Sequence, residues 1–364
     1  MTNNAPPLLA HIDEISPRWI DQVFAHAGLH APLVASLQIE PFGQGTASTV
    51  ARLTLLYAGD PRHAPRTLIA KFPKITATGA APDAQLLGYE REVMAYRFFQ
   101  STPAFRLPKC YFADIRADGV FNLILEELCD DCWPGNQITG CSIAEARAVV
   151  DTLAQLHAAY CDTPELHALS WPKRRRQLAD QSARLFAAGA AVIRERNRGE
   201  LGAAALATID GVAPLVGPWS ATTSTPETLI HTDARVDNII FERTPRGINA
   251  CLIDLQSMAI GAPAHDLAYF LSGSLEPAER AQCERELVAK HAAVLIAAGA
   301  KLDPAMAWER YRQHAIAGLV ATVCAAAILP NSPAIDRLLV TLARRNCAAV
   351  QELDGIEAAR AYLR

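Results

Sequence analysis

The sequence lacks the features that mark proteins binding nucleic acid or crossing a membrane. Its formal net charge is −4, from 34 Lys and Arg against 38 Asp and Glu. With no basic excess, we expect no nucleic-acid partner. The longest apolar run, residues 315–330, ends in a proline and is shorter than the roughly 20 residues that span a bilayer. We therefore expect a buried helix in this run and no membrane partner.

We also expect no secretory signal, because the first residues contain no positive segment followed by an apolar one. The nine cysteines show no regular spacing. One Cys-x-x-Cys pair, Cys129 and Cys132, has no second pair that would complete a zinc site. We expect reduced thiols, no zinc and a cytoplasmic location.

What the chain does contain is enough apolar sequence for two packed lobes. It has 364 residues, of which 51% are hydrophobic and 20% charged. Alternating or apolar segments predict strands near residues 34–42, 48–59, 66–74, 109–115 and 121–128, with a helix over 84–100 between the third and fourth. Residues 1–127 are therefore predicted to form an N-terminal lobe with a five-stranded antiparallel sheet and a helix, which the resemblance given below makes the nucleotide-binding lobe.

The pattern becomes helical after Leu128. Ser142 and Glu145 form a capping box at the start of an apolar-periodic segment, and helix signals continue to about residue 213. Two short apolar strands joined by a glycine-containing turn interrupt them, and helices then dominate to the end. We predict an α+β, two-lobed fold, with a mainly β N-terminal lobe and a mainly α lobe over residues 128–364.

Polar side chains flank the two strands that interrupt the helices. Asp233 and Asn238 lie in the segment "HTDARVDN", and Asp254 follows the second strand in "LIDLQ". A hairpin would bring the three near one another, and oxygen ligands suit Mg²⁺, which takes one or two carboxylates plus substrate phosphates. Taken singly, each of these residues is more often a turn or strand cap.

The N-terminal lobe supplies a complementary set of residues. Gly43 and Gly45 lie between two strands, where glycine lets the backbone approach a ligand closely. Lys71 lies inside an apolar strand and needs an anionic partner. Glu92 shares a helix face with aromatic residues and is the first candidate for this partner, with Glu90 as the alternative.

These segments, between about residues 38 and 275, resemble the small-molecule branch of the protein-kinase-like fold, which includes aminoglycoside, choline and ecdysteroid kinases. "HTDARVDN" is similar to the catalytic loop of that branch, "IDLQ" to its metal-binding triplet and "LIAKF" to its lysine strand. "YEREVMAY" resembles the glutamate helix and "LILEEL" the adenine hinge. "IDLQ" followed by "GAPAHDLAYF" is most similar to the ecdysteroid-kinase-like group.

The resemblance implies an ATP- and Mg²⁺-dependent phosphotransferase that acts on a hydroxyl of a small molecule. Lys71, held by Glu92, would bind the nucleotide phosphates, and Asn238 and Asp254 would hold Mg²⁺. Asp233 would receive or orient the hydroxyl proton. Backbone groups of Glu126, Glu127 and Leu128 would bind adenine, and Gly43, Gly45 and Ser48 would lie over the phosphates.

Two departures and several smaller roles accompany the resemblance. Thr232 stands where the family has glycine before the catalytic Asp, and the glycine loop is short of the full protein-kinase pattern. We expect His231 to support its loop and His157 to be a hydrogen-bonded core histidine. Asp266 is expected to cap a helix or brace the catalytic loop.

Several other functions remain as alternatives. A protein kinase needs an activation loop, and the segment from Asp254 to Asp266 is too short for one. A non-catalytic nucleotide-binding module would not need the intact set of charged residues, and no ligand cluster for a metal-dependent hydrolase is evident. The helical segments are not acidic, which argues against a polycationic aminoglycoside acceptor, while an aminoglycoside or choline-type kinase stays open as the alternative. We expect a neutral or partly apolar alcohol.

Overall fold

The computed structural model describes residues 5–42, 48–74, 83–100, 105–128, 131–223 and 225–364. The chain divides into two compact units. The first contains residues 1–103, 107–130 and 254–257, and the second contains residues 104–106, 131–253 and 258–364. The short segment 254–257, which begins with Asp254, therefore belongs to the N-terminal unit although it follows the strands of the second.

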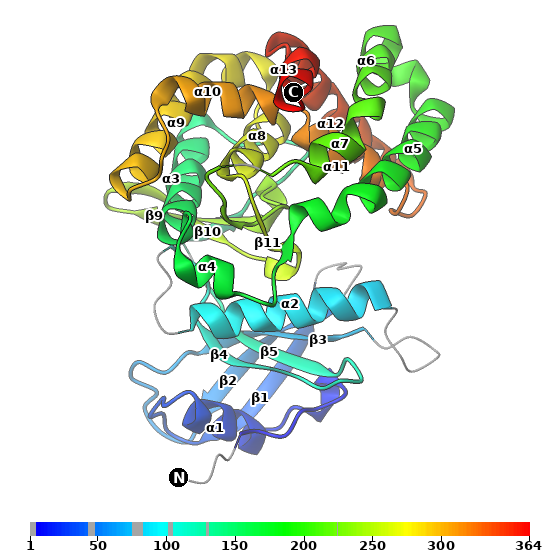
Figure 1. Ribbon diagram of the computed structural model, residues 1–364. Helices are drawn as coiled ribbons and strands as arrows, with labels where there is room; N and C mark the ends of the chain where they lie inside the picture. Colours follow the sequence, from blue (N-terminus) through cyan, green and yellow to red (C-terminus); the bar gives the residue numbers. More distant parts are fainter. Residues whose placement is uncertain (1–4, 43–47, 75–82, 101–104, 129–130, 224) are drawn as a thin grey trace. The chain divides into compact units, whose positions relative to one another are not determined.

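The first unit is built on a five-stranded sheet in the order β1-β2-β3-β5-β4, in which every neighbouring pair is antiparallel. Figure 1 shows α1 and α2 beside this sheet. The bounds are α1 Pro17–His26, β1 Val34–Pro41, β2 Ser48–Tyr57, β3 Thr67–Pro73, α2 Asp83–Phe99, β4 Cys110–Ile115 and β5 Phe121–Glu126.

Alternation along β3 decides which side chains face each helix. Ala70 and Phe72 are buried in the apolar cluster that also contains Trp19 and Ile20 of α1. Because successive side chains of a strand point to opposite faces, Lys71 points away from α1. It faces the side of the sheet that carries α2.

The second unit is mainly helical, as predicted. Its principal helix after the hinge, α3 (Ile143–Tyr160), begins with the predicted capping box: Ser142 Oγ accepts from Glu145 N, and Glu145 Oε2 accepts from Ser142 N at 2.7 Å. The other α-helices are α4 Pro164–Ala168, α5 Ala179–Arg196, α6 Arg198–Val212, α7 Val216–Ala221, α8 Pro263–Ser274, α9 Pro277–Ala297, α10 Pro304–Gln313, α11 Ala317–Ala326, α12 Pro333–Glu352 and α13 Gly355–Tyr362.

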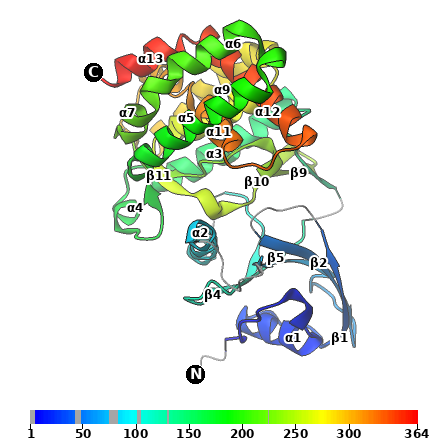
Figure 2. The same cartoon turned by 90° about the vertical axis from the view of Figure 1, so that its right-hand side faces the viewer.

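The core of this unit forms around α11, within the apolar run that was expected to be a buried helix. Leu319 and Val323 of α11 are fully buried, and Figure 2 shows the helix running between α5 and α12. Gly189 of α5 lies so close to the Val323 carbonyl that a Cβ would be 1.7 Å from its oxygen. The close packing of α5 on α11 therefore depends on glycine at this position.

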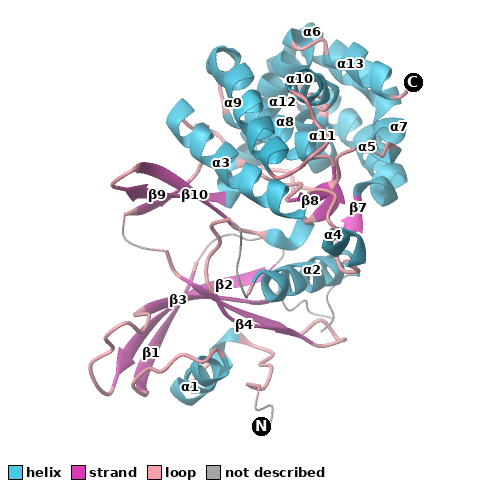
Figure 3. Ribbon diagram, turned by 60° about the vertical axis from the view of Figure 1, so that its left-hand side comes forward, coloured by secondary structure: helices cyan, strands magenta, loops and turns pink. Residues whose placement is uncertain are grey.

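Two small sheets carry the loops of interest, and Figure 3 shows their strands among the helices. β9 (Ile239–Thr244) and β10 (Gly247–Leu252) form the predicted hairpin, extended by β6 (Cys132–Pro134). β11 (Ala259–Gly261) lies between β7 (Lys173–Arg174) and β8 (Thr228–Ile230). β6, β7, β8 and β11 were not predicted, because strands of two or three residues contain too little sequence to show alternation.

One stretch among the described residues, 198–221, is long and apolar enough to cross a membrane by length and composition. It comprises α6, a 3₁₀ turn at Ala213–Leu215 and α7, and the backbone of Gly202 is non-helical. Its residues Leu201, Ile209 and Val212 are part of the buried core cluster. These three side chains thus pack inside the second unit.

Candidate active site

Lys71 and Glu92 form a buried ion pair in the first unit. Lys71 Nζ lies 2.5 Å from Glu92 Oε1, and the Glu92 side chain is 3% exposed. On the same face of α2, Tyr89 and Tyr96 are buried, whereas Glu90 is exposed. The predicted pairing is confirmed, and the alternative partner Glu90 is excluded by the helix geometry.

Asp254 lies on the other side of the same ammonium group. Its Oδ1 is 4.0 Å from Lys71 Nζ. Burial acts to lower the pKa of Lys71, but the carboxylates of Glu92 and Asp254 outweigh it and leave that pKa raised. Lys71 is therefore a firmly protonated cation, suited to binding phosphate oxygens.

The conformation of Asp254 leaves one oxygen available. Its backbone is left-handed, with φ of 62°, a region that an L-residue adopts at a cost. Oδ1 is buried and accepts no hydrogen bond from the described residues, while Gln256 Nε2 lies 3.4 Å from Oδ2. A buried carboxylate oxygen without a donor is the kind of atom that a cation would satisfy.

Asp233 lies in the second unit, in the loop that follows β8. Tyr269 OH donates to its Oδ1 at 2.7 Å, and Asn238 Nδ2 donates to its Oδ2 at 3.0 Å and to its backbone carbonyl at 2.9 Å. Arg235 Nε is 3.6 Å from Oδ1. Two neutral donors, one on each oxygen, thus hold the carboxylate in a single orientation.

Asn238 can serve Asp233 and a metal at once. Its amide nitrogen is used by Asp233, and its Oδ1 has no hydrogen bond with the part of the chain that the structure describes. The backbone N–H of Ile253 donates to the Asn238 carbonyl at 3.0 Å, and Asp254 is the next residue in the chain. The Asn238 amide oxygen in the second unit and Asp254 Oδ1 in the first are each an oxygen of the kind that Mg²⁺ binds.

The described residues contain no group of three or more His, Cys, Asp and Glu that would hold a metal ion. A magnesium ion does not require one, because it commonly uses one or two protein oxygens together with substrate phosphates and water. A carboxylate such as Asp254 and an amide oxygen such as that of Asn238 are ligands of this type. The same observation gives no support to a zinc hydrolase within the described residues.

Tyr269 was not identified from the sequence. It lies on α8 three residues after Asp266, so the two share a helix face. Burial, and next the negative charge of Asp233, raise the pKa of Tyr269 well above its usual value, so the phenol stays neutral and donates. The available signal was the i, i+3 spacing in "HDLAYF", which places Tyr269 beside the residue expected to brace the loop.

Asp266 braces the catalytic loop, as predicted. Its Oδ2 accepts from the His231 backbone N–H at 2.5 Å, and its Oδ1 accepts from the Thr232 N–H at 2.9 Å. His157 Nε2 lies 3.3 Å from Oδ2, and His157 Nδ1 is 2.8 Å from His291 Nε2. The prediction of a hydrogen-bonded core histidine at 157 is confirmed.

His231 supports the loop from the inside. Its side chain is fully buried, and its Nε2 donates to the Ile253 carbonyl at 2.9 Å. This bond ties the loop that carries Asp233 to the end of the β9–β10 hairpin. The geometry is that of a structural residue, in agreement with the sequence-based expectation.

Thr232, which replaces the glycine of the family pattern, has φ of 65°. This left-handed conformation is unusual for a β-branched residue and costs roughly 1–2 kcal/mol. The hydrogen bond from Thr232 N to Asp266 helps to hold it. The chain therefore keeps the backbone shape that glycine would adopt freely, with Asp266 as the restraint.

The remaining predicted nucleotide-binding residues are only partly tested. Gly43 and Gly45 lie outside the described residues, and Ser48 begins β2. The Glu126 N–H already donates to the Lys109 carbonyl at 2.8 Å, so it is not free for adenine, and Glu127 forms an ion pair with Arg52. The backbone carbonyls and the Leu128 N–H remain predictions.

A comparison with protein-family models matches residues 43–303 to the ecdysteroid kinase-like family. The match covers more than half of the chain. The chain belongs to the ecdysteroid kinase-like family. The resemblance drawn from "IDLQ" and "GAPAHDLAYF" is thereby confirmed, whereas a comparison with curated proteins finds no match.

Solved structures show that this family member has the fold of small-molecule kinases. It is 13% identical to choline kinase from Cryptosporidium parvum Iowa II, covering 90% of this chain and 93% of that one, with a TM-score of 0.58. For Plasmodium vivax ethanolamine kinase the identity is 13%, the match covers 93% of this chain and 89% of that one, and the TM-score is 0.55. For the GDP complex of aminoglycoside 2'-phosphotransferase-IIIa the identity is 14%, the match covers 86% of this chain and 93% of that one, and the TM-score is 0.51.

Proposed function

We propose that this ecdysteroid kinase-like protein is an ATP- and Mg²⁺-dependent phosphotransferase that phosphorylates a hydroxyl of a small molecule. The observation that carries the proposal is the Lys71–Glu92 ion pair beside a carboxylate, Asp254, whose buried Oδ1 accepts no hydrogen bond from the described residues. Phosphoryl transfer depends mostly on positioning and on neutralising charge. The fixed ammonium group of Lys71 and the Asp254 oxygen, which suits a cation, supply positioning and charge neutralisation.

In the proposed reaction the acceptor hydroxyl oxygen bonds to the γ-phosphorus and the bond from that phosphorus to the β-phosphate oxygen breaks, releasing ADP. Lys71 neutralises nucleotide phosphate charge. Mg²⁺, held by Asn238 and Asp254, would supply the remaining charge neutralisation. Asp233 receives or orients the hydroxyl proton, with its carboxylate oriented by Tyr269 and Asn238.

The non-catalytic alternative is disfavoured by the same contacts. A module that only binds nucleotide has no need of a carboxylate oriented through both oxygens, as Asp233 is. The charge balance of the helical segments argues against a polycationic acceptor. A neutral or partly apolar alcohol remains the acceptor expected from the sequence.

A screen of candidate alcohols tests the proposal. The purified chain is incubated with ATP, Mg²⁺ and one alcohol at a time, and acceptor-dependent ADP release is measured against the Asp233→Asn variant. At least one alcohol should give ADP release in the wild type that the variant loses. ADP release that no alcohol stimulates, or that Asp233→Asn retains in full, would count against a phosphotransferase.

A further inference from the structure

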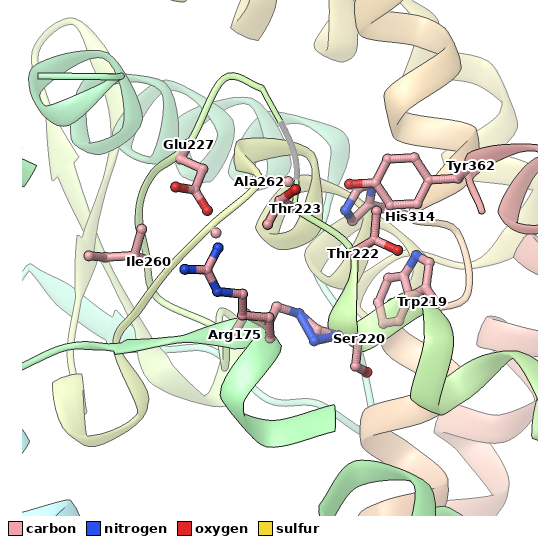
Figure 4. A pocket seen from close by; sticks show the side chains of 12 residues that line it. Arg175, Trp219, Ser220, Thr222, Thr223, Glu227, Ile260, Ala262, His314 and Tyr362 are labelled. Carbon is pink, nitrogen blue, oxygen red and sulfur yellow. The ribbon is translucent and has the colours of Figure 1, made fainter. Parts of the chain in front are cut away.

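A pocket in the second unit lies beside β11 and α7, away from any residue assigned above to nucleotide or metal. Figure 4 shows Arg175, Trp219, Ser220, Thr222, His314 and Tyr362 among the side chains that line it. The space open to a water-sized sphere is about 20 Å³. A cavity of this size holds about one water molecule or the tip of a ligand.

Arg175 is the unusual member of this pocket. Its guanidinium carbon lies 4.3 Å from the centre of the Trp219 ring, and its Nε donates to His265 Nδ1 at 3.2 Å. The described residues offer no carboxylate within ion-pair distance of it. Its two terminal nitrogens, which carry four of the five donor protons, are thus left for a ligand.

The acids near Arg175 are already engaged. Glu227, which also lines the pocket, pairs with Arg174 at 2.8 Å. Asp266 uses its oxygens for the backbone N–H groups of His231 and Thr232. The partly exposed guanidinium of Arg175 therefore has no anion among the described residues, and an anionic group of a ligand would complete it.

The histidines around the pocket add no further charge. Burial, and then the positive charges of Arg175 and His314, lower the pKa of His265 well below its usual value. Burial is also the main cause that lowers the pKa of His314 to about 3. Both rings are neutral at physiological pH, so the positive charge that lines the pocket comes from Arg175, beside the Trp219 ring, and from the exposed Arg176.

A second unpaired donor lines the same pocket. Ser220 is 2% exposed, and its Oγ has no hydrogen-bond partner among the described residues. Trp219, by contrast, is fixed by the bond from its Nε1 to the Gln313 carbonyl at 2.9 Å. The pocket therefore combines a rigid wall with two kinds of donor, a guanidinium fork and a hydroxyl, that lack an acceptor.

The pocket is linked to Asp233 through α8. Arg175 donates to His265, the rings of His265 and Tyr269 are stacked with centroids 6.3 Å apart, and Tyr269 OH donates to Asp233. All of these groups belong to one compact unit. Contacts within one unit therefore connect Arg175 with the proposed proton acceptor.

We propose that this pocket binds a carboxylate of the acceptor, so that the substrate is an alcohol that also carries a carboxylic acid. The inference rests on the proposed phosphotransferase function and narrows its acceptor. The planar guanidinium matches a carboxylate in two parallel hydrogen bonds. The small cavity favours this flat group over a tetrahedral phosphate, and the unpaired cation disfavours choline-like or aminoglycoside-like acceptors.

Binding of simple probes tests the pocket without turnover. Calorimetry compares benzoate, benzamide and inorganic phosphate on the full chain, with the variants Arg175→Gln, Arg175→Lys and Ser220→Ala. We expect benzoate to bind better than benzamide or phosphate, and Arg175→Gln to weaken it by roughly tenfold or more, as for a lost charge-assisted hydrogen bond. Arg175→Lys and Ser220→Ala should weaken it less. Arg184→Gln, on the exposed face of α5, is the control that should change nothing.

Turnover tests the link to the acceptor. Hydroxy acids and their methyl esters are compared as matched acceptors for ADP release. The acid should have the lower KM, and Arg175→Gln should abolish this preference while leaving kcat within about twofold, because the group that binds is not the group that reacts.

Equal use of acid and ester, benzoate binding that survives Arg175→Gln, or binding of phosphate alone would each overturn the inference. These results leave the phosphotransferase proposal intact if Mg²⁺-dependent nucleotide binding is present. Loss of nucleotide binding in the wild type would reject the phosphotransferase instead, so the two failures are distinguishable.

Discussion

In the first unit Glu92 is neutralised by the opposite charge of Lys71 at 2.5 Å, whereas in the second unit Asp266 is fully buried against two backbone N–H groups and a histidine. An ion pair buried in this way depends on both members being present. A carboxylate held by backbone groups instead fixes the shape of a loop. The first unit thus uses the Glu92 carboxylate to hold the Lys71 ammonium group. The second uses the Asp266 carboxylate to set the geometry of the loop around Asp233.

The largest expected effect concerns the two aspartates assigned to different steps. Asp233→Asn should lower kcat by roughly 10²–10⁴-fold, the usual contribution of a positioned acid–base group, with nucleotide affinity nearly unchanged. Asp254→Asn should instead weaken Mg²⁺-nucleotide binding. Calorimetry and single-turnover kinetics on both variants check this. Equal loss of binding in the two variants would show that their roles are wrongly assigned.

The ion pair of the first unit is broken by Lys71→Met. Removal of one partner leaves Glu92 buried without a counter-charge, which typically costs about 3–5 kcal/mol of unfolding free energy. The double variant Lys71→Met with Glu92→Leu should lose less unfolding free energy than Lys71→Met alone. Urea denaturation measures both. As a control, Arg147→Ala breaks an exposed pair with Glu286 and should cost below about 1 kcal/mol.

The buried neutral histidines of the second unit should make it sensitive to acid. His314 has a pKa of about 3 in the folded chain, mainly through burial, against an ordinary value of 6.5. Below pH 6.5 the unfolded chain binds a proton that the folded chain does not, so stability falls as pH falls, over the window from about 6.5 to 3. Between pH 6.5 and pH 5 this amounts to about 2 kcal/mol.

Removal of that side chain should flatten the pH dependence. His314→Gln should lose less unfolding free energy between pH 7 and pH 5 than the wild type does, by about the 2 kcal/mol given above. Denaturation series at several pH values measure the slope. His30→Gln, at an exposed position, should leave the slope as it is. An unchanged slope in His314→Gln would contradict the account of a neutral buried ring.

A smaller effect is expected from Tyr269→Phe. Loss of its hydrogen bond leaves Asp233 with Asn238 and Arg235 as neighbours, and one such bond to a charged group corresponds to roughly tenfold in kcat. The acid limb of the pH–rate profile should move to higher pH, because the bond favours the charged carboxylate. Tyr57→Phe, which removes a bond to the Pro65 carbonyl, should leave the profile unchanged. An unshifted profile with unchanged kcat in Tyr269→Phe would exclude a positioning role.

The sequence predicted contacts between neighbouring elements better than contacts between distant ones. Lys71 and Glu92 lie on consecutive elements, so strand alternation and helix periodicity were sufficient to pair them. Tyr269 and Asp233 are 36 residues apart, and no local period connects a helix with a loop at that distance. The left-handed backbone of Thr232 was also not predicted, because only the contacts with Asp266 explain how a threonine is held in this conformation.

The surroundings of Arg175 are a further contact between distant elements that the sequence did not predict. In the sequence it is one of four successive basic residues, 173–176, and nothing in that run distinguishes it from a solvated charge. β7 and β11 are too short to be predicted, yet their pairing carries Arg175 to the pocket that contains Trp219. The family fold and the charged set of the site were therefore predictable, whereas the neighbours that give individual side chains their roles were not.

Magnesium-dependent nucleotide binding tests the central claim most directly. Calorimetry of the purified chain with a non-hydrolysable ATP analogue is carried out with Mg²⁺ and again with excess chelator, and it is repeated on Lys71→Met. The account predicts binding in the presence of Mg²⁺ that weakens clearly on chelation and in the variant. Absence of nucleotide binding, or binding that neither chelation nor Lys71→Met alters, would contradict it.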